Sequence, residues 1–233
     1  MQGFDRGCAS SSRLKLFIMI SDRVVSYPVA TNETAFTGYV WDVRRDEFTL
    51  NDTQVTRDYL VHPGAVAIIA LNDAGELLLI EQYRHAQSKI MWEAPAGLMD
   101  LANEDPLETA KRELYEETGY VAKTWNVLLD FANSPGGSSE QIRIYFARDV
   151  SLHPDGRPQG SDEELDMPVH WIPIQDILES IRRGAVTNPQ LVAGTHAALI
   201  AMAEPDLALR SADAPWHARE DALAANRVWL PKN

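Results

Sequence analysis

Three glutamates, Glu113, Glu116 and Glu117, occupy positions i, i+3 and i+4 of a segment with helical spacing. At 3.6 residues per turn, their side chains would project within about 100° of one another. Like charges at these spacings destabilise a helix by about 0.2–0.5 kcal/mol per pair, and Arg112 can neutralise only part of this charge. A hard divalent cation, Mg²⁺ or Mn²⁺, takes oxygen ligands and would be a natural partner. From the spacing alone, a solvated acidic helix face is the simpler explanation.

The helix that carries these glutamates has start and stop signals at both ends. Asp105 suits the N-cap, Pro106 the first helical position and Gly119 a left-handed C-cap, while Glu108 would complete a capping box. We therefore expect a helix over 105–119. Its buried stripe would consist of Leu107, Ala110 and Leu114.

The surrounding stretch, EAPAGLMDLANEDPLETAKRELYEETGY from Glu93 to Tyr120, resembles the Nudix box, G-x5-E-x7-R-E-U-x-E-E-x-G-U. The positions of the box are filled by Gly97, Glu104, Arg112, Glu113, Leu114, Glu116, Glu117, Gly119 and Tyr120. Six residues rather than five separate Gly97 from Glu104, and the last apolar position is Tyr120. Extra length in the loop before a helix costs little. The resemblance implies hydrolysis of a nucleoside diphosphate linked to another moiety, with a divalent metal.

The same resemblance implies roles for individual residues. It implies a metal ligand set made of Glu113, Glu117, the backbone carbonyl of Ala96, and Glu116 as a ligand or near-ligand. Arg112 would orient the glutamates. Gly97 would allow the loop to approach the metal closely.

Other features are similar to the ADP-ribose pyrophosphatases of this family, particularly the actinobacterial type. Pro135 lies fifteen residues after the box, and the runs HPGAVAIIAL, EQYRHA and WEAPAGL are also similar. The likeness covers roughly 38–203. It implies that Arg57 and Arg84 contact the diphosphate and the terminal ribose, because the guanidinium fork pairs with phosphate oxygens. It further implies a substrate-binding group that includes Glu93, Pro135 and Gly136. The alternatives are surface ion pairs for the arginines and an ordinary loop carboxylate at Glu93.

The implied reaction is attack of water on the adenosyl phosphorus, which gives AMP and ribose 5-phosphate and needs a base. The acidic segment 160–164 resembles the catalytic loop of the family, with Glu164 as the first candidate and Glu163 as the second. Glu140 is a rival, and an ordinary solvated loop is the alternative for all three. Another nucleoside diphosphate sugar or an oxidised nucleotide remains open as the substrate. A non-catalytic ADP-ribose-binding module is disfavoured because the glutamates are all present.

The fold class expected around this site is α/β. Residues 35–62 alternate as in an antiparallel sheet, and runs 65–71 and 76–82, joined by Asn72-Asp73-Ala74-Gly75, indicate a hairpin. Further strands are expected at 125–131, 141–147 and 169–172, and helices at 174–184 and 189–203. We expect a Nudix-type α/β/α sandwich with a mixed sheet (63–205), an N-terminal β-sheet (35–62), a poorly defined extension (1–34) and a loosely packed tail (206–233).

Composition limits the partners and the compartment. Among 233 residues, 34 acidic and 21 basic side chains give a net charge of −13, which disfavours nucleic acid and anionic membranes as partners. The only cysteine, Cys8, indicates a reducing, cytoplasmic environment. The apolar run 14–20 is too short to span a membrane. The resemblance implies a homodimer in which residues 35–60 wall the partner's base pocket. Phe36, Tyr39 or Trp41 would stack on adenine, with core packing as the alternative for each.

Overall fold

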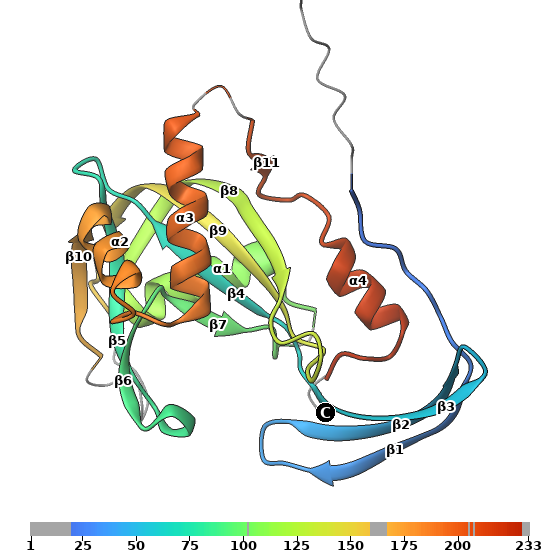
Figure 1. The fold of residues 1–233 in the computed structure, drawn as a ribbon. Helices are drawn as coiled ribbons and strands as arrows, with labels where there is room; N and C mark the ends of the chain where they lie inside the picture. The colour runs from blue at the N-terminus through green and yellow to red at the C-terminus, as the bar shows by residue number, and fades with distance from the viewer. Residues whose placement is uncertain (1–19, 102, 159–166, 205, 207, 230–233) are drawn as a thin grey trace, which may run out of the picture.

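The computed structural model describes residues 20–101, 103–158, 167–204, 206 and 208–229. Its centre is a five-stranded mixed sheet in the order β11-β8-β9-β4-β7 (Figure 1). The strands are β4 (Ala65–Ala70), β7 (Ala96–Leu98), β8 (Tyr120–Ala132), β9 (Gln141–Leu152) and β11 (Arg210–Ser211). Strands β4 and β9 are parallel, and the other neighbours are antiparallel. The strands predicted at 125–131 and 141–147 are the central parts of β8 and β9.

A second sheet has the order β10-β5-β6, formed by β10 (Val169–Pro173), β5 (Glu76–Arg84) and β6 (Lys89–Glu93). The hairpin predicted between β4 and β5 is wrong. The turn exists, because Asn72 Oδ1 accepts from the amides of Ala74 and Glu76 at 3.0 Å, but only a single bridge, Leu71 to Leu77, links the strands. Turn chemistry determines where the chain reverses, whereas the partners of β4 are decided by its burial on both faces.

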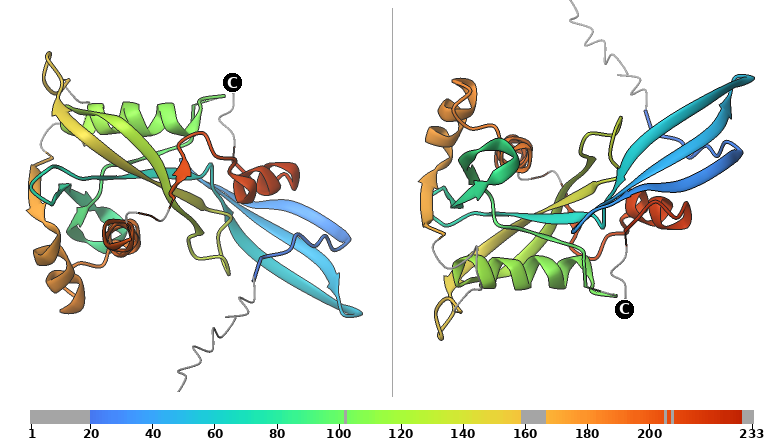
Figure 2. Two further views of the ribbon diagram at one scale, coloured as in Figure 1. Left: turned by 90° about the horizontal axis from the view of Figure 1, so that it is seen from above. Right: turned by 90° about the horizontal axis from the view of Figure 1, so that it is seen from below.

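Helices lie on both sides of the central sheet, as an α/β/α sandwich requires. Helix α1 (Pro106–Thr118) covers one face and α3 (Pro189–Ala203) the other, while α2 (Ile174–Arg182) packs against α3 and β10 on the same side as α3 (Figure 2). Side chains alternate along β4: Val66, Ile68 and Ala70 pack with Ala110 and Leu114 of α1. Ala65, Ala67 and Ile69 pack in the cluster that contains Ile177, Leu191 and Ala198. This alternation confirms the predicted fold class.

A three-stranded antiparallel sheet projects from this body (Figure 1, Figure 2). It consists of β1 (Val29–Thr37), β2 (Asp42–Leu50) and β3 (Thr53–Val61) in that order. The sheet begins at Val29 rather than at residue 35, because residues before 35 join the ladder with β2 although they lack apolar alternation. Every residue of β1 is exposed. Within the described residues, no helix is long and apolar enough to cross a membrane.

The C-terminal segment is not the loosely packed tail that we expected. It contains β11 and helix α4 (His217–Ala224), and Trp216 is only 4% exposed. The buried guanidinium of Arg143 donates to the carbonyls of Ala214 (2.6 Å) and Pro215 (2.9 Å) and lies over the Trp216 ring. It also forms a bidentate pair with Asp130 at 2.8 and 3.0 Å. The C-terminal segment is thus anchored through one aromatic residue and two backbone carbonyls, and such contacts leave no periodic pattern in the sequence from which they could be predicted.

Candidate active site

Helix α1 forms where its end signals predict. Asp105 Oδ1 accepts from the amide of Leu107 at 2.8 Å, Pro106 opens the first turn, and Gly119 closes the helix with φ +76°. The capping-box bond expected from Glu108 is replaced by an ion pair with Lys111 at 2.7 Å. These caps fix where the helix begins and ends, and burial of Ala110 and Leu114 against the sheet sets which carboxylates face it.

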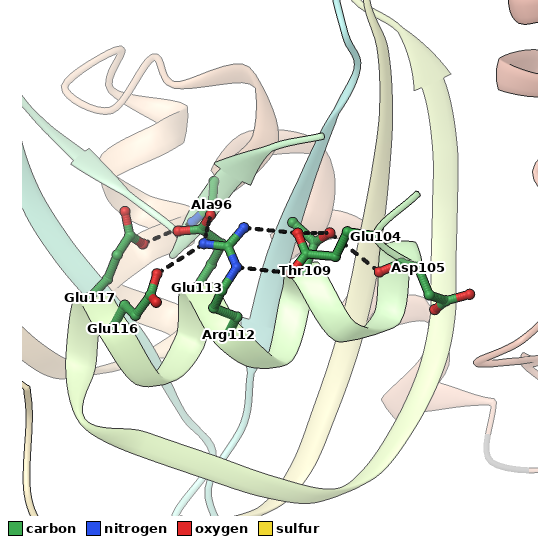
Figure 3. A network of polar contacts seen from close by, with 8 residues as sticks. All are labelled: Ala96, Glu104, Asp105, Thr109, Arg112, Glu113, Glu116 and Glu117. Carbon is green, nitrogen blue, oxygen red and sulfur yellow. Dashed lines mark hydrogen bonds and ion pairs between the residues drawn. The ribbon is translucent and has the colours of Figure 1, made fainter. Parts of the chain in front are cut away.

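Arg112 is the centre of an acidic network on α1 (Figure 3). Its Nε and Nη2 atoms each lie 3.0 Å from an oxygen of Glu104, and Nη1 lies 2.7 Å from Glu113 and 2.9 Å from Glu116. The hydrogen bonds from Arg112 hold the pKa of the Glu104 carboxyl below its usual value. One guanidinium thus faces three carboxylates, and this face of the helix remains negative. Arg112 therefore contacts two of the three glutamates that the resemblance names, Glu113 and Glu116.

The loop that enters β7 lies against the other carboxylates of the helix. The Ala96 amide donates to Glu117 Oε2 at 2.9 Å (Figure 3), and a Cβ atom added at Gly97 would overlap the carboxyl group of Glu113. Glu113 and Glu117 are 9% and 5% exposed, respectively. Only glycine allows the backbone to come this close to Glu113.

The donors at this place suit a hard divalent cation. Carboxylate oxygens and a backbone carbonyl are its preferred ligands, and the hydrogen at Gly97 leaves the approach from the loop open. Within the described part of the chain, no three acidic or histidine side chains converge to form a ready-made metal site. Arg112 holds Glu113 and Glu116 by ion pairs, so binding a metal requires these side chains to reorient. The residues fit the ion by donor type and by access.

A cleft of about 620 Å³ opens beside this loop. Its walls include Trp41, His62, Arg84, Glu93, Ala96, Gly97, Asn133 and Glu140. Arg84 and Glu93, which we predicted as substrate contacts, form a bidentate pair in it at 2.9 and 2.7 Å. The Glu93 carboxylate is buried, whereas the Arg84 side chain is 43% exposed. The pair therefore presents a partly exposed guanidinium held in orientation by a buried anion.

Three other predicted substrate contacts lie elsewhere. Arg57, Pro135 and Gly136 line a second cleft of about 740 Å³, between the N-terminal sheet and α4. Arg57 lies on β3, in the sheet that projects from the body, and Arg57 Nη1 donates to the carbonyl of Thr56 at 2.8 Å. The loop 133–140 separates the two clefts, because Asn133 and Glu140 line the first. In this chain, Arg57 does not meet Arg84.

The two candidates for the base, Glu163 and Glu164, lie outside the described residues. The residues that flank their segment lie beside the helix: Arg157 donates to the carbonyl of Met167 at 2.8 Å and to that of Glu116 at 3.4 Å. The rival candidate, Glu140, is in the first cleft, where its Oε2 accepts from Asn133 Nδ2 at 2.7 Å. Burial raises the pKa of the Glu140 carboxyl.

The sequence did not single out His62, which lies 3.4 Å from Glu140 Oε1 through its Nε2 atom. Trp41 stacks on the His62 ring, with centroids 4.5 Å apart and planes at 19°. Of the three aromatic residues considered for adenine, Trp41 lines the cleft, whereas Phe36 and Tyr39 are exposed on the projecting sheet. No sequence pattern connects His62 with Glu140, since only the tertiary fold brings β3 and the loop together.

Known proteins with similar sequences share most of the chain. The chain is 40% identical over 206 residues to the ADP-ribose pyrophosphatase of Mycobacterium tuberculosis, which covers 87% of this chain and 97% of the relative. It is 38% identical to a methanol dehydrogenase activator of Bacillus methanolicus, covering 58% and 73%, respectively. It is 33% identical to the ADP-ribose pyrophosphatase of Bacillus subtilis, covering 64% and 80%.

A solved structure described as an ADP compounds hydrolase has a similar fold. Its TM-score is 0.67 at 18% identity, and the match covers 79% of this chain and 98% of that one. A family profile described as NUDIX domain matches residues 61–193, which include the glycine loop, the glutamate helix and the cleft residues named above except Trp41. With this match and its relatives, the chain belongs to the NUDIX domain family.

Proposed function

We propose that this protein is an enzyme that hydrolyses the diphosphate of ADP-ribose to AMP and ribose 5-phosphate. The observation that carries the proposal is the placement of the Ala96–Gly97 backbone on the buried carboxylates of α1, next to a cleft that contains Arg84 and Glu93. Two relatives named ADP-ribose pyrophosphatases, at 40% and 33% identity, support the choice of substrate.

Mg²⁺ or Mn²⁺ would be held by Glu113, Glu116, Glu117 and the carbonyl of Ala96. When bound, the ion would neutralise the diphosphate and lower the pKa of a water that attacks the adenosyl phosphorus. Arg112 would keep the glutamates in place and limit their mutual repulsion while the site is free of metal. These assignments rest on the donor set and on the resemblance of the Nudix box.

The remaining groups of the chain would bind the substrate and move one proton. The guanidinium of Arg84 would pair with phosphate oxygens, and Glu93 would orient it or accept from a ribose hydroxyl. Glu164 would take the proton from the attacking water, with Glu163 as the second choice. Glu140 stays a rival, because it lines the cleft and burial raises the pKa of its carboxyl above its usual value.

We also propose that the protein is a cytoplasmic homodimer. The lone cysteine supports a reducing compartment. The projecting sheet carries exposed apolar residues, Val29, Phe36, Tyr39 and Val40, which a second copy could cover. Arg57, Pro135 and Gly136 would then meet substrate at a shared pocket, rather than within one chain.

Incubation with ADP-ribose, ADP-glucose, NADH and 8-oxo-dGTP in the presence of Mg²⁺, followed by identification of the products, tests the function. We expect AMP from ADP-ribose at by far the highest kcat/KM. Cleavage of the triphosphate alone would reject the proposal. Omitting the metal should abolish turnover, and adding Mn²⁺ should restore it.

A further inference from the structure

His62 occupies a junction between the N-terminal sheet, the cleft and the C-terminal segment. It follows the end of β3 and is 6% exposed. Its backbone amide donates to Ser139 Oγ at 3.0 Å, and its carbonyl accepts from the amide of Trp229 at 3.3 Å. These bonds hold the backbone of His62 against the loop that carries Glu140.

The hydrogen bonds of the ring define its protonation. The amide of Gly64 donates to Nδ1 at 3.0 Å, so Nδ1 is an acceptor and carries no proton. A neutral imidazole must then carry its proton on Nε2, the atom that lies 3.4 Å from Glu140 Oε1. Burial lowers the pKa of His62 to about 4, which agrees with a neutral ring at physiological pH.

The two oxygens of Glu140 are held from different sides. Asn133 Nδ2 donates to Oε2 at 2.7 Å, and His62 Nε2 faces Oε1. Trp41 covers the imidazole by stacking at 4.5 Å, which keeps the ring from turning away. The carboxylate is therefore confined on the wall of the cleft by an amide and an imidazole that are both anchored.

We propose that His62 is a positioning residue, whose neutral Nε2–H group acts with Asn133 to fix the orientation of the Glu140 carboxylate in the cleft. Nε2 and Oε1 are 3.4 Å apart, a close polar contact that is longer than a well-formed hydrogen bond, and such active-site contacts often shorten when substrate binds. The kinetic consequence rests on the proposed function, whereas the tautomer of His62 does not.

A double-mutant cycle tests whether His62 acts through Glu140. His62→Phe keeps an aromatic ring against Trp41 and removes the donor, so we expect kcat/KM for ADP-ribose to fall about tenfold. In the Glu140→Gln background, the same change should cost less than about twofold. His62→Gln places an amide nitrogen near the position of Nε2 and should recover most of the loss. Losses that multiply in the double variant, or an unchanged kcat/KM in His62→Phe, would overturn the proposal.

A second measurement needs no substrate and observes the His62 ring directly. In ¹⁵N-histidine-labelled protein, we expect the His62 ring to be the Nε2–H tautomer from about pH 5.5 to 8, with signals that shift in Glu140→Gln. The His62→Gln variant identifies these signals. An Nδ1–H tautomer, or titration with a pKa near its ordinary value of about 6.5, would refute the positioning role. If wild type cleaves no ADP-ribose but the tautomer is as expected, only the proposed function fails.

Discussion

At Glu117, a single substitution can remove the charge of the side chain and keep its shape. Glu117→Gln retains an oxygen that can accept from the Ala96 amide, so the fold should persist, but it removes a ligand charge. By comparison with the loss of one stabilising group in other active sites, we expect kcat to fall about a hundredfold or more. Glu108→Gln, at an exposed position of the same helix, is the matched control. Turnover within about tenfold of wild type at saturating Mg²⁺ would show that α1 is not the metal site.

His62 also predicts a pH dependence of stability. Its folded pKa of about 4 lies below its ordinary value of 6.5, because burial disfavours the charged ring. Between about pH 6.5 and 4, His62 is therefore protonated in the unfolded chain and neutral in the folded chain. The free energy of unfolding falls as the pH drops through this interval. Among the charged groups nearby, Glu140 lies 3.4 Å from the His62 ring, and the Arg219 guanidinium donates to the carbonyl of the next residue, Pro63, at 3.4 Å. The raised pKa of Glu140 acts in the opposite direction.

Urea unfolding at pH 7 and pH 5 measures this effect. Wild type should lose more stability on acidification than His62→Gln, with a difference of about 1–2 kcal/mol over this interval. His196→Gln, at an exposed histidine on α3, provides the control and should follow wild type. Equal losses in wild type and His62→Gln would show that His62 titrates normally.

At the scale of elements, the contact between the β7 loop and α1 depends on the missing side chain at Gly97. Gly97→Ala would push its Cβ atom into the Glu113 carboxyl group, so either the loop or the glutamate must move. We expect weaker Mn²⁺ binding and a lower kcat, with a loss of stability of about 1–3 kcal/mol. At Gly137, a Cβ atom would meet nothing within 4 Å, so Gly137→Ala is a matched control. Unaltered Mn²⁺ affinity in Gly97→Ala would contradict the assigned role of this loop.

The elements themselves were predictable to different degrees. Helix α1 was predicted because its caps and its apolar stripe are local, and α3 was predicted over the residues it occupies, 189–203. The pairing of strands was not predicted correctly, because β4 and β5 belong to different sheets despite the turn between them. The strands β6 and β7 were missed: β7 has only three residues, and β6 begins with two exposed residues and lacks a clear alternation.

At the scale of the whole molecule, Trp216 and Arg143 tie the C-terminal segment to the central sheet. Trp216→Ala should lower the free energy of unfolding by about 3–5 kcal/mol, as expected for removal of a buried aromatic side chain. Leu223→Ala, on the exposed side of α4, should have a much smaller effect. Denaturant unfolding of both variants compares them directly. A small loss in Trp216→Ala would mean that the segment is not anchored at this point.

The exposed apolar residues of the projecting sheet lead us to predict a homodimer. We expect light scattering to give the mass of a dimer, and Phe36→Glu on β1 to give a monomer with reduced activity. Leu152→Glu, which alters a similarly exposed apolar residue on the body (60% against 63% for Phe36), should leave the dimer intact. A wild-type monomer with full activity would contradict a shared pocket.

The sequence by itself determined the acidic helix, its caps, the glycine before it and the family, because each depends on residues close together in the chain. The tertiary structure alone decided which of the residues predicted to contact substrate lie together: Arg84 and Glu93 share one cleft, whereas Arg57 lines another. It alone brought His62 to Glu140 and Trp216 to Arg143. Local spacing encodes a helix and its ends, but contacts between remote segments depend on how the sheets pack, and that is settled only when the whole chain folds.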